Sequence, residues 1–317
     1  MPTITQLQYI VTVDKLRHFG EAAQACHVSQ PSLSMQIMKV EDEIGFPLFD
    51  RVKKPIVPTE KGARFIESAR AVLREHERMM AHAKKDEKEV SGEFRLGVIP
   101  TIAPYLLPLF LEKFSITYPK VKLHVDEMKT ESIVAELKKD LLDAAVLATP
   151  LNEQGLNEEP MFYEKFYLYV SENHPLSKKT RVKQDDIDGT GIWLIQDGHC
   201  LRNQMIRLCS LKNQKGVFKN IYFEGGNLET LRYLVQKGHG YTLIPQLFLN
   251  TLSPPERKKY VREFETPSPM REVSLIARRD QWKSDIMRAI FDSITQNLPK
   301  DFQTSLAAKE ALVVKVV

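Results

Sequence analysis

Two of the three cysteines, Cys200 and Cys209, lie nine positions apart in the second half of the 317-residue sequence. His199 precedes Cys200, and Arg202 follows it by two positions. A thiol beside an imidazole and a guanidinium, near a predicted helix start, is expected to have a lowered pKa and to react as the thiolate. Peroxide would oxidise that thiolate to a sulfenic acid, which a second thiol condenses to a disulfide. We therefore expect reversible chemistry, with Cys200 as the peroxidatic thiol and Cys209 as the resolving one.

The segment between the two thiols is predicted to be helical, because Leu201, Met205 and Leu208 share one helical face. Nine helical residues separate the sulfurs by ~13 Å along the axis, whereas a disulfide joins Cα atoms up to ~7 Å apart. The segment would have to rearrange before the pair could bond, which would couple oxidation to a conformational switch. Two other interpretations of the cysteine pair are considered beside a redox switch. The thiols could be small buried hydrophobes. They could also be zinc ligands, but this is disfavoured because no second Cys/His pair follows at the usual spacing.

Composition limits the class of protein. Three cysteines are too few for a secreted disulfide framework, and a pair in a reducing compartment favours redox or catalytic roles. The sequence has no apolar run of ~18 residues and no charged-then-apolar signal at its start, so we expect a cytoplasmic protein without a membrane partner. The net charge is +4, which is compatible with nucleic acid. The first 65 residues carry eight basic against seven acidic side chains, so basicity adds little to that interpretation.

Residues 1–58 have the pattern of short helices joined by tight turns. Helices are expected over 7–14, 19–26 and 29–44, and Ser29 can cap the third at its start, where Pro31 fits the first turn. Gly45 is expected to end that helix in the left-handed conformation. The segment 46–58 contains three prolines and is predicted to form a β-wing. We expect Cys26, in the second helix, to belong to the core.

The third helix offers short polar side chains at its start above an apolar underside. Glutamine can pair with adenine edges and serine with base edges or phosphates, while basic side chains contribute phosphate contacts. The predicted DNA contacts are Ser29, Gln30, Pro31, Ser32, Ser34, Gln36, Lys39 and Arg51. A helical protein-interaction domain is the alternative that this pattern leaves open.

Residues 59–88 are predicted to form one long helix that begins after Thr59. Its apolar seam follows a 3-4 spacing through Ile66, Ala69, Leu73, His76, Met80 and Ala83. Such a seam favours pairing with a second copy of the helix. The alternative is a long helix that lies on its own domain.

From Glu93 onward, β-strand and helix patterns alternate. Strands are expected over 94–99, 121–125, 144–148, 166–170, 192–195, 219–223, 241–244 and 273–277, and helices over 102–118, 131–139, 228–237 and 281–297. Alternation of this kind predicts parallel sheets. Two such sheets, with an effector cleft between them, fit the length.

The N-terminal motifs resemble the LysR family of regulators over a long, ordered run. The resemblance is carried by Phe19-Gly20-Glu21-Ala22-Ala23, Val28 to Ser34, Gln36-Ile37, Glu41, Ile44-Gly45, Leu48 to Arg51 and Pro58 to Gly62. It implies an α/β protein with a winged helix-turn-helix, a long linker helix and a two-lobed regulatory domain like periplasmic binding proteins. It also implies a homodimer or homotetramer that binds double-stranded promoter DNA and contacts RNA polymerase. An activator is expected, although the sequence leaves repression, or both modes, open.

The C-terminal motifs resemble the peroxide-sensing members of that family. They are Asp197 to Arg202 with Cys209, Val98 to Thr101, Pro104 to Pro108, Leu228 to Arg232 and Pro254 to Lys258. This resemblance implies a reversible Cys200–Cys209 disulfide, control of oxidative-stress genes and a cellular dithiol reductant, without a cofactor or metal. It also implies a hydrogen peroxide pocket formed by Thr101, Thr130, His199 and Arg271, whose hydroxyl, imidazole and guanidinium groups suit a departing hydroxide. Without the resemblance, the two threonines would be ordinary strand-end or cap residues.

The resulting domain prediction has four parts. They are a DNA-binding domain over 1–58, a linker and dimerisation helix over 59–90, a regulatory domain over 91–300 and a tail over 301–317, to which no role is assigned. Within the regulatory domain, lobe I is expected over about 91–163 and 267–300, and lobe II over about 164–266.

Three other functions remain open. The chain could be a LysR-type regulator that responds to a small organic effector without thiol chemistry. It could be a thiol peroxidase, although such an enzyme would not need residues 1–88, and we expect no enzyme. It could also be a binding protein that uses its helical segment to oligomerise.

Overall fold

The computed structural model describes residues 1–84, 89–208, 223, 225–302, 311–314 and 316. These residues form two compact units, Met1–Glu89 and Val90–Val317. Each unit has its own apolar core. No helix among the residues described is both long and apolar enough to cross a membrane.

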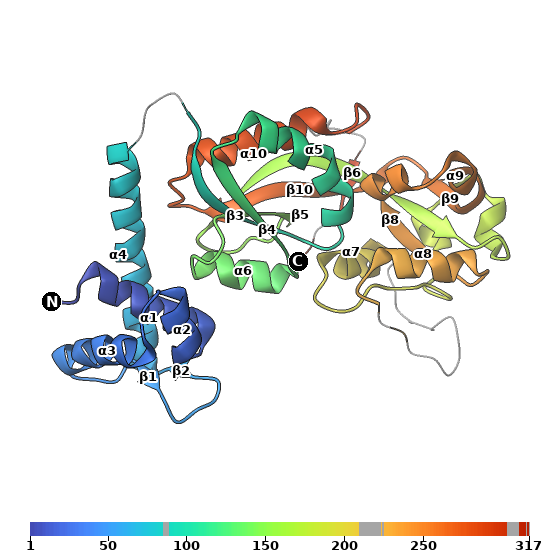
Figure 1. The fold of residues 1–317 in the computed structure, drawn as a ribbon. Coiled ribbons are helices and arrows are strands. Elements are labelled where there is room, and N and C mark those ends of the chain that lie inside the picture. The colour runs from blue at the N-terminus through green and yellow to red at the C-terminus, as the bar shows by residue number, and fades with distance from the viewer. Residues whose placement is uncertain (85–88, 209–222, 224, 303–310, 315, 317) are drawn as a thin grey trace. The chain divides into compact units, whose positions relative to one another are not determined.

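The first unit contains the predicted helices and the predicted wing (Figure 1). Its elements are α1 (Ile4–Leu16), α2 (Phe19–Ala25), α3 (Gln30–Ile44), the antiparallel strands β1 (Phe49–Asp50) and β2 (Val57–Pro58), and α4 (Glu60–Lys84). The caps of α3 form as expected. The Ser29 hydroxyl accepts a hydrogen bond from the Ser32 amide at 3.3 Å, and Gly45 ends the helix with a φ of 78°.

A close backbone approach fixes α4 against the wing. A Cβ atom at Gly62 would lie 2.0 Å from the Leu48 carbonyl oxygen, so only glycine fits there. Further along α4, the guanidinium of Arg70 pairs with the carboxylate of Asp14 on α1 at 2.6 Å, and both groups are buried. The first turns of α4 therefore belong to the core of the first unit.

The helical seam is divided between two environments. Ile66 and Ala69 are buried in the core of the first unit. This part of the helix therefore lies on its own domain, which was the alternative to pairing with a second copy. Later on α4, Val72, Met79 and Met80 are exposed. An apolar surface thus remains on the part of the helix that extends beyond the core.

Cys26, which we expected in the core, caps the end of α2. It is only partly buried, at the edge of the core of the first unit.

The second unit is a two-lobed α/β domain built around one mixed sheet. Its strands are β3 (Gly92–Val98), β4 (Val121–Glu127), β5 (Ala144–Thr149), β6 (Leu156–Val170), β7 (Arg181–Val182), β8 (Tyr241–Pro245), β9 (Val261–Phe264), β10 (Ser268–Arg278) and β11 (Ala311–Val313). The sheet runs in the order β4-β3-β5-β10-β6-β9-β7, with β11 on β10 and β8 on β6.

The helices of this unit are α5 (Ala103–Thr117), α6 (Thr130–Lys138), α7 (Cys200–Leu208), α8 (Leu228–Gln236), α9 (Pro254–Tyr260) and α10 (Ser284–Asn297), with short 3-10 turns over 175–178, 184–186 and 246–251. Helices α5 and α10 lie side by side on one face of the first lobe, and α6 lies on the other face (Figure 1). Strands β6 and β10 are long enough to extend from one lobe into the other.

The expectation of parallel sheets was wrong for half of this unit. Strands β3, β4 and β5 are parallel, but β10 pairs antiparallel with both β5 and β6, and β6 pairs antiparallel with β8 and β9. The predicted strand over 192–195 makes only isolated bridges at Ile192 and Ile195. Most of the strand predicted over 219–223 lies outside the described residues. The tail contributes β11, a strand that the sequence pattern did not indicate.

Candidate functional site

Cys200 is the first residue of α7, and its side chain is only 4% exposed. Gly198, two positions earlier, has a φ of 86°, a left-handed conformation that glycine adopts without strain. That turn leads directly into the helix start. The predicted partner, Cys209, lies outside the described residues, so the pairing stays a prediction.

The groups around the Cys200 sulfur come from distant parts of the chain. Arg271 on β10, Thr130 at the start of α6 and the backbone of Ala148 on β5 and Leu201 all favour the thiolate and lower its pKa. Complete burial has the larger effect and raises the pKa of the Cys200 thiol. The expected lowered pKa is therefore contradicted, because the sequence showed the cationic neighbours and did not show the burial.

The two sequence neighbours of Cys200 do not act as predicted. The Arg202 guanidinium pairs with the carboxylate of Asp197 at 2.6 Å and donates to the Ile195 carbonyl at 3.0 Å. Burial and the nearby Lys129 ammonium lower the pKa of His199, which favours the neutral imidazole. The positive charge at the thiol is thus supplied by Arg271, which lies 71 positions away in sequence.

Arg271 is held in place by two partners. Its guanidinium pairs with the Glu164 carboxylate at 2.6 Å, and both side chains are fully buried. It also donates to the hydroxyl and carbonyl oxygens of Thr101, at 3.3 and 3.2 Å. The second carboxylate oxygen of Glu164 accepts from the Leu247 amide at 2.9 Å. The structure therefore brings Thr101, Thr130, Arg271 and Cys200 to one site.

Glu164 is a member of this site that the sequence reasoning missed. A signal was available, because Glu164 interrupts the apolar run of β6, much as Arg271 interrupts that of β10. A buried charge on each of two core strands indicates an ion pair between them, but the predicted strands, over 166–170 and 273–277, included neither residue.

Two polar atoms near the thiol are buried without a hydrogen-bond partner among the described residues. One is the Thr130 hydroxyl oxygen, which lies close enough to the Cys200 sulfur to favour its thiolate. The other is Nε2 of His199, the residue before Cys200. Because buried polar groups are nearly always paired, these two atoms have hydrogen-bonding capacity that the described residues do not use. Groups of His, Cys, Asp or Glu that could hold a metal ion are absent from the part of the chain that is described.

The predicted DNA contacts lie on and beside α3. Gln30, Pro31, Lys39 and Arg51 are exposed, as is the cap residue Ser29, while Ser32, Ser34 and Gln36 are half-buried. Some of these side chains already have partners, since Gln36 accepts from Gln6 at 3.0 Å, and Arg51 pairs with Glu41 at 2.7 Å and donates to Ser34 at 3.2 Å.

Two apolar side chains on α3 were not predicted. Met35 and Met38 are 48% and 45% exposed among the polar residues. Apolar side chains can contact thymine methyl groups in the major groove. The exposed surface of α3 is therefore less polar than its first turn suggests.

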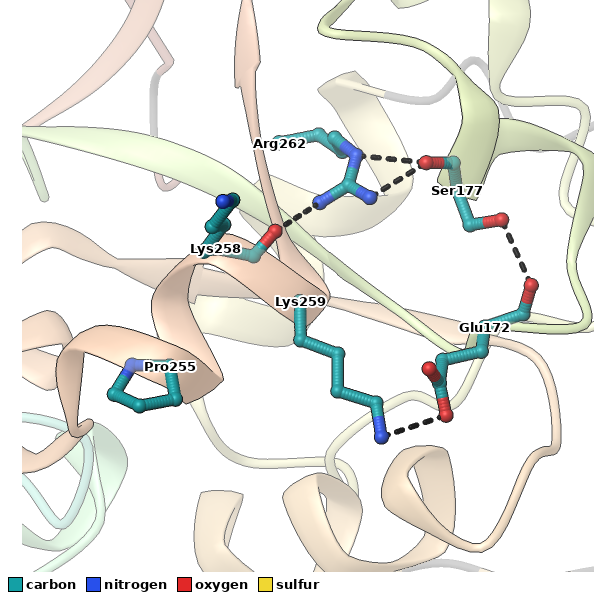
Figure 2. Close-up of a pocket in the computed structure, with 6 residues that line it drawn as sticks. All are labelled: Glu172, Ser177, Pro255, Lys258, Lys259 and Arg262. Atoms are coloured by element: carbon teal, nitrogen blue, oxygen red, sulfur yellow. Dashed lines mark hydrogen bonds and ion pairs between the residues drawn. The ribbon is translucent and has the colours of Figure 1, made fainter.

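A separate pocket lies where α9 and the start of β9 face the segment that follows β6 (Figure 2). It is lined by Glu172, Ser177, Pro255, Lys258, Lys259 and Arg262. Most of its charges are already satisfied, because Lys259 pairs with Glu172 at 2.8 Å and Arg262 donates to the Ser177 carbonyl at 2.5 and 3.0 Å. None of the thiol-site residues lines this pocket, so it is distinct from the site around Cys200.

Comparison with protein families gives two matches that together cover most of the chain. Residues 4–63 match the bacterial regulatory helix-turn-helix of the lysR family, and residues 87–299 match the LysR substrate binding domain. A hydrogen peroxide-inducible genes activator from Pectobacterium carotovorum is 37% identical over 279 residues, which cover 87% of this chain and 90% of the relative.

Solved structures with similar folds include two OxyR proteins. A full-length OxyR variant from Pseudomonas aeruginosa has a TM-score of 0.80 at 29% identity, covering 94% of this chain and 99% of that one. An H2O2-bound cysteine-to-serine mutant of Corynebacterium glutamicum OxyR has a TM-score of 0.58 at 27% identity, with 94% of each chain covered.

Proposed function

The chain belongs to the LysR family of DNA-binding transcriptional regulators and is closely related to hydrogen peroxide-inducible activators, and we propose that it senses hydrogen peroxide at Cys200. In this proposal Cys200 is the peroxidatic thiol and Cys209 the resolving one. Thr101, Thr130, His199 and Arg271 form the peroxide pocket. The protein regulates transcription and is not an enzyme in its own right.

The observation that carries the proposal is a buried thiol whose thiolate is favoured by a buried cation and by a threonine hydroxyl. The Arg271 charge and the Thr130 hydroxyl both favour the Cys200 thiolate, and the Thr130 oxygen has no other hydrogen-bond partner among the described residues. Hydrogen peroxide, which both donates and accepts hydrogen bonds, would suit these groups. One OxyR with a similar fold has been solved with H2O2 bound.

The chemistry balances without a cofactor. The Cys200 thiolate attacks one peroxide oxygen, the O–O bond breaks, and the departing hydroxide takes up a proton to leave as water. The Arg271 charge and the Thr130 hydroxyl stabilise the negative charge that moves from sulfur to oxygen. The Cys209 thiol then attacks the sulfenic sulfur, which forms the disulfide and releases a second water. Two electrons pass from the two thiols to the peroxide.

The length of α7 makes the second step a conformational one. The Cα atoms of Cys200 and Leu208 are eight residues apart on the helix, which is ~12 Å along its axis. Cys209 follows Leu208 by one Cα–Cα step of ~3.8 Å, so it stays at least ~8 Å from Cys200 while the helix is intact. A disulfide requires ~7 Å or less. Oxidation would therefore unwind part of α7.

The unwinding of α7 would alter transcription. We propose that the chain acts as a homodimer or homotetramer on promoter DNA, that it contacts RNA polymerase, and that a cellular dithiol reductant resets it. The exposed Val72, Met79 and Met80 on α4 support a helix that pairs with a second copy. A rearranged regulatory domain would then change the spacing of paired DNA-binding units.

Thiol trapping and peptide mapping after brief, near-stoichiometric peroxide test the proposal. We expect a linked Cys200–Cys209 peptide in the wild type, and a Cys200 sulfenate in Cys209→Ser. Cys26→Ser is the matched control, since it removes the half-buried third thiol, and should leave the linked peptide unchanged. If both thiols stay free in the wild type, peroxide sensing is wrong and the small organic effector becomes the alternative.

A further inference from the structure

The C-terminal tail returns to the sheet beside the thiol site. Strand β11 pairs in parallel with the start of β10, with Ala311 opposite Ser268 and Val313 opposite Met270. The pairing continues beyond the strand, because the Val314 amide donates to the Met270 carbonyl at 2.8 Å. Met270 is the residue immediately before Arg271. The tail strand is therefore bonded to the part of β10 that carries the cation of the site.

The same tail residue also holds the helix that carries Cys200. Gln204, one turn into α7, is fully buried, and its side-chain amide donates to the Val314 carbonyl at 2.9 Å. Val314 and Val316 are themselves 7% and 4% exposed. Val314 thus connects α7 to β10 through its two backbone groups.

The chain is anchored again before the tail strand begins. The Phe302 ring packs edge-on against Phe162 on β6, with ring centroids 5.7 Å apart, and Gln246 donates to the Asp301 carboxylate at 2.9 Å. These contacts fix residues 301–302 on the sheet independently of β11. Release of β11 would therefore leave the tail attached.

We propose that residues 311–314 are a latch that positions α7 in the reduced state and that must release before Cys200 reaches Cys209. This inference rests on the proposed function. Gln204 lies within the helix that has to unwind, so its bond to Val314 cannot survive a rearrangement of that turn. The latch opposes the resolving step and leaves the peroxide step unchanged, since the groups that favour the Cys200 thiolate are those of Arg271, Thr130, Ala148 and Leu201 and none is from the described tail residues. It thereby sets how readily a sulfenate becomes a disulfide.

Two variants separate the latch from a general structural role. Gln204→Leu keeps the buried volume but removes the donor, and a chain that ends at residue 310 removes the whole strand. Asn203→Leu is the matched control, since Asn203 is the exposed neighbour on the same helix. Stopped-flow peroxide kinetics and quenched thiol mapping give the two rates separately.

We expect Gln204→Leu to accelerate disulfide formation from the sulfenate roughly two- to tenfold, the range of one hydrogen bond, and the truncation to do so at least as much. Sulfenate formation, measured with Cys209→Ser in each background, should change by less than about twofold. Asn203→Leu should change neither rate. An unchanged resolving rate in both test variants would overturn the latch.

Hydrogen exchange of the wild type gives an independent readout. In the reduced protein, the peptide that contains Val314 should be protected, and full oxidation should remove that protection. Equal protection before and after complete disulfide formation would also overturn the latch. If no linked Cys200–Cys209 peptide forms at all, the proposed function fails and the latch with it, so the thiol map distinguishes the two failures.

Discussion

The guanidinium of Arg271 and the carboxylate of Glu164 lie 2.6 Å apart, and neither side chain is exposed to solvent. Removing one member of such a pair leaves an uncompensated charge in a medium of low polarity. The pair joins β10 to β6 and directs a cation at the buried thiol. It is therefore the contact through which the sheet controls the electrostatics of Cys200.

We predict strong coupling between these two side chains. Glu164→Gln and Arg271→Met should each lower the free energy of unfolding by about 3–5 kcal/mol, and the double variant by clearly less than the sum. Urea unfolding followed by tryptophan fluorescence measures this, since both tryptophans, Trp193 and Trp282, lie in the second unit. The exposed Lys122–Glu93 pair, at 2.7 Å, is the matched control and should contribute at most about 1 kcal/mol. Additivity at Glu164 and Arg271 would contradict the prediction.

A second prediction concerns the Thr130 hydroxyl. If it serves the peroxide, Thr130→Val should slow the oxidation of Cys200 about ten- to hundredfold, the value of a hydrogen bond to a charged group. The same change should leave the stability unchanged or increased, because the hydroxyl oxygen is buried without another partner among the described residues.

Thr242→Val is the matched control for that experiment. The Thr242 hydroxyl is buried and donates to the Trp193 carbonyl at 2.9 Å. Its loss should lower the free energy of unfolding by about 1–3 kcal/mol and leave the oxidation rate within about twofold. If Thr130→Val instead destabilised the protein at an unchanged rate, the hydroxyl would be structural.

A third prediction follows from the burial of the thiol. Burial raises the pKa of Cys200, so the neutral thiol predominates at neutral pH and the reactive thiolate becomes more abundant as the pH rises. In Cys209→Ser, the peroxide rate constant should therefore increase about tenfold per pH unit over about pH 6–9. Arg271→Met should lower the rate throughout this range, because it removes a cation that favours the thiolate. A rate independent of pH would mean that the thiolate is already formed.

Local sequence signals predicted the first unit well. The cap at Ser29, the stop at Gly45 and the wing depend on contacts between residues near each other in sequence. In the second unit, the pairing of β6 with β10 depends on residues about a hundred positions apart, and no local pattern encodes its direction. Parallel sheets were therefore expected where long antiparallel strands occur.

The site likewise depends on contacts between residues far apart in sequence, which local patterns did not predict. Sequence neighbours of Cys200 were given an electrostatic role, but Arg202 is bound to Asp197, and the effective charge comes from Arg271. The motif resemblance nevertheless named Thr101, Thr130 and Arg271, which the structure brings together. Glu164 was missed because the predicted strand began at residue 166, and the tail strand because its pairing with β10 is made only in the folded chain.

A fourth prediction separates the two kinds of DNA contact on α3. Gln30, the exposed first residue of the helix, is predicted to contact base edges, whereas the exposed Lys39 lies ~13 Å further along the axis. Gln30→Ala should weaken binding to a cognate fragment by about 1–3 kcal/mol and leave binding to random DNA nearly unchanged. Lys39→Ala should weaken both and reduce the slope of log affinity against log salt by about one.

Fluorescence anisotropy on a fragment selected from random-sequence DNA measures these effects across a salt series. Ser68→Ala, an exposed change on α4, serves as the control and should alter neither affinity nor slope. If Gln30→Ala weakened binding to cognate and to random DNA equally, Gln30 would position the helix and would not recognise a base. Recognition would then depend on other α3 side chains, among them the exposed Met35 and Met38.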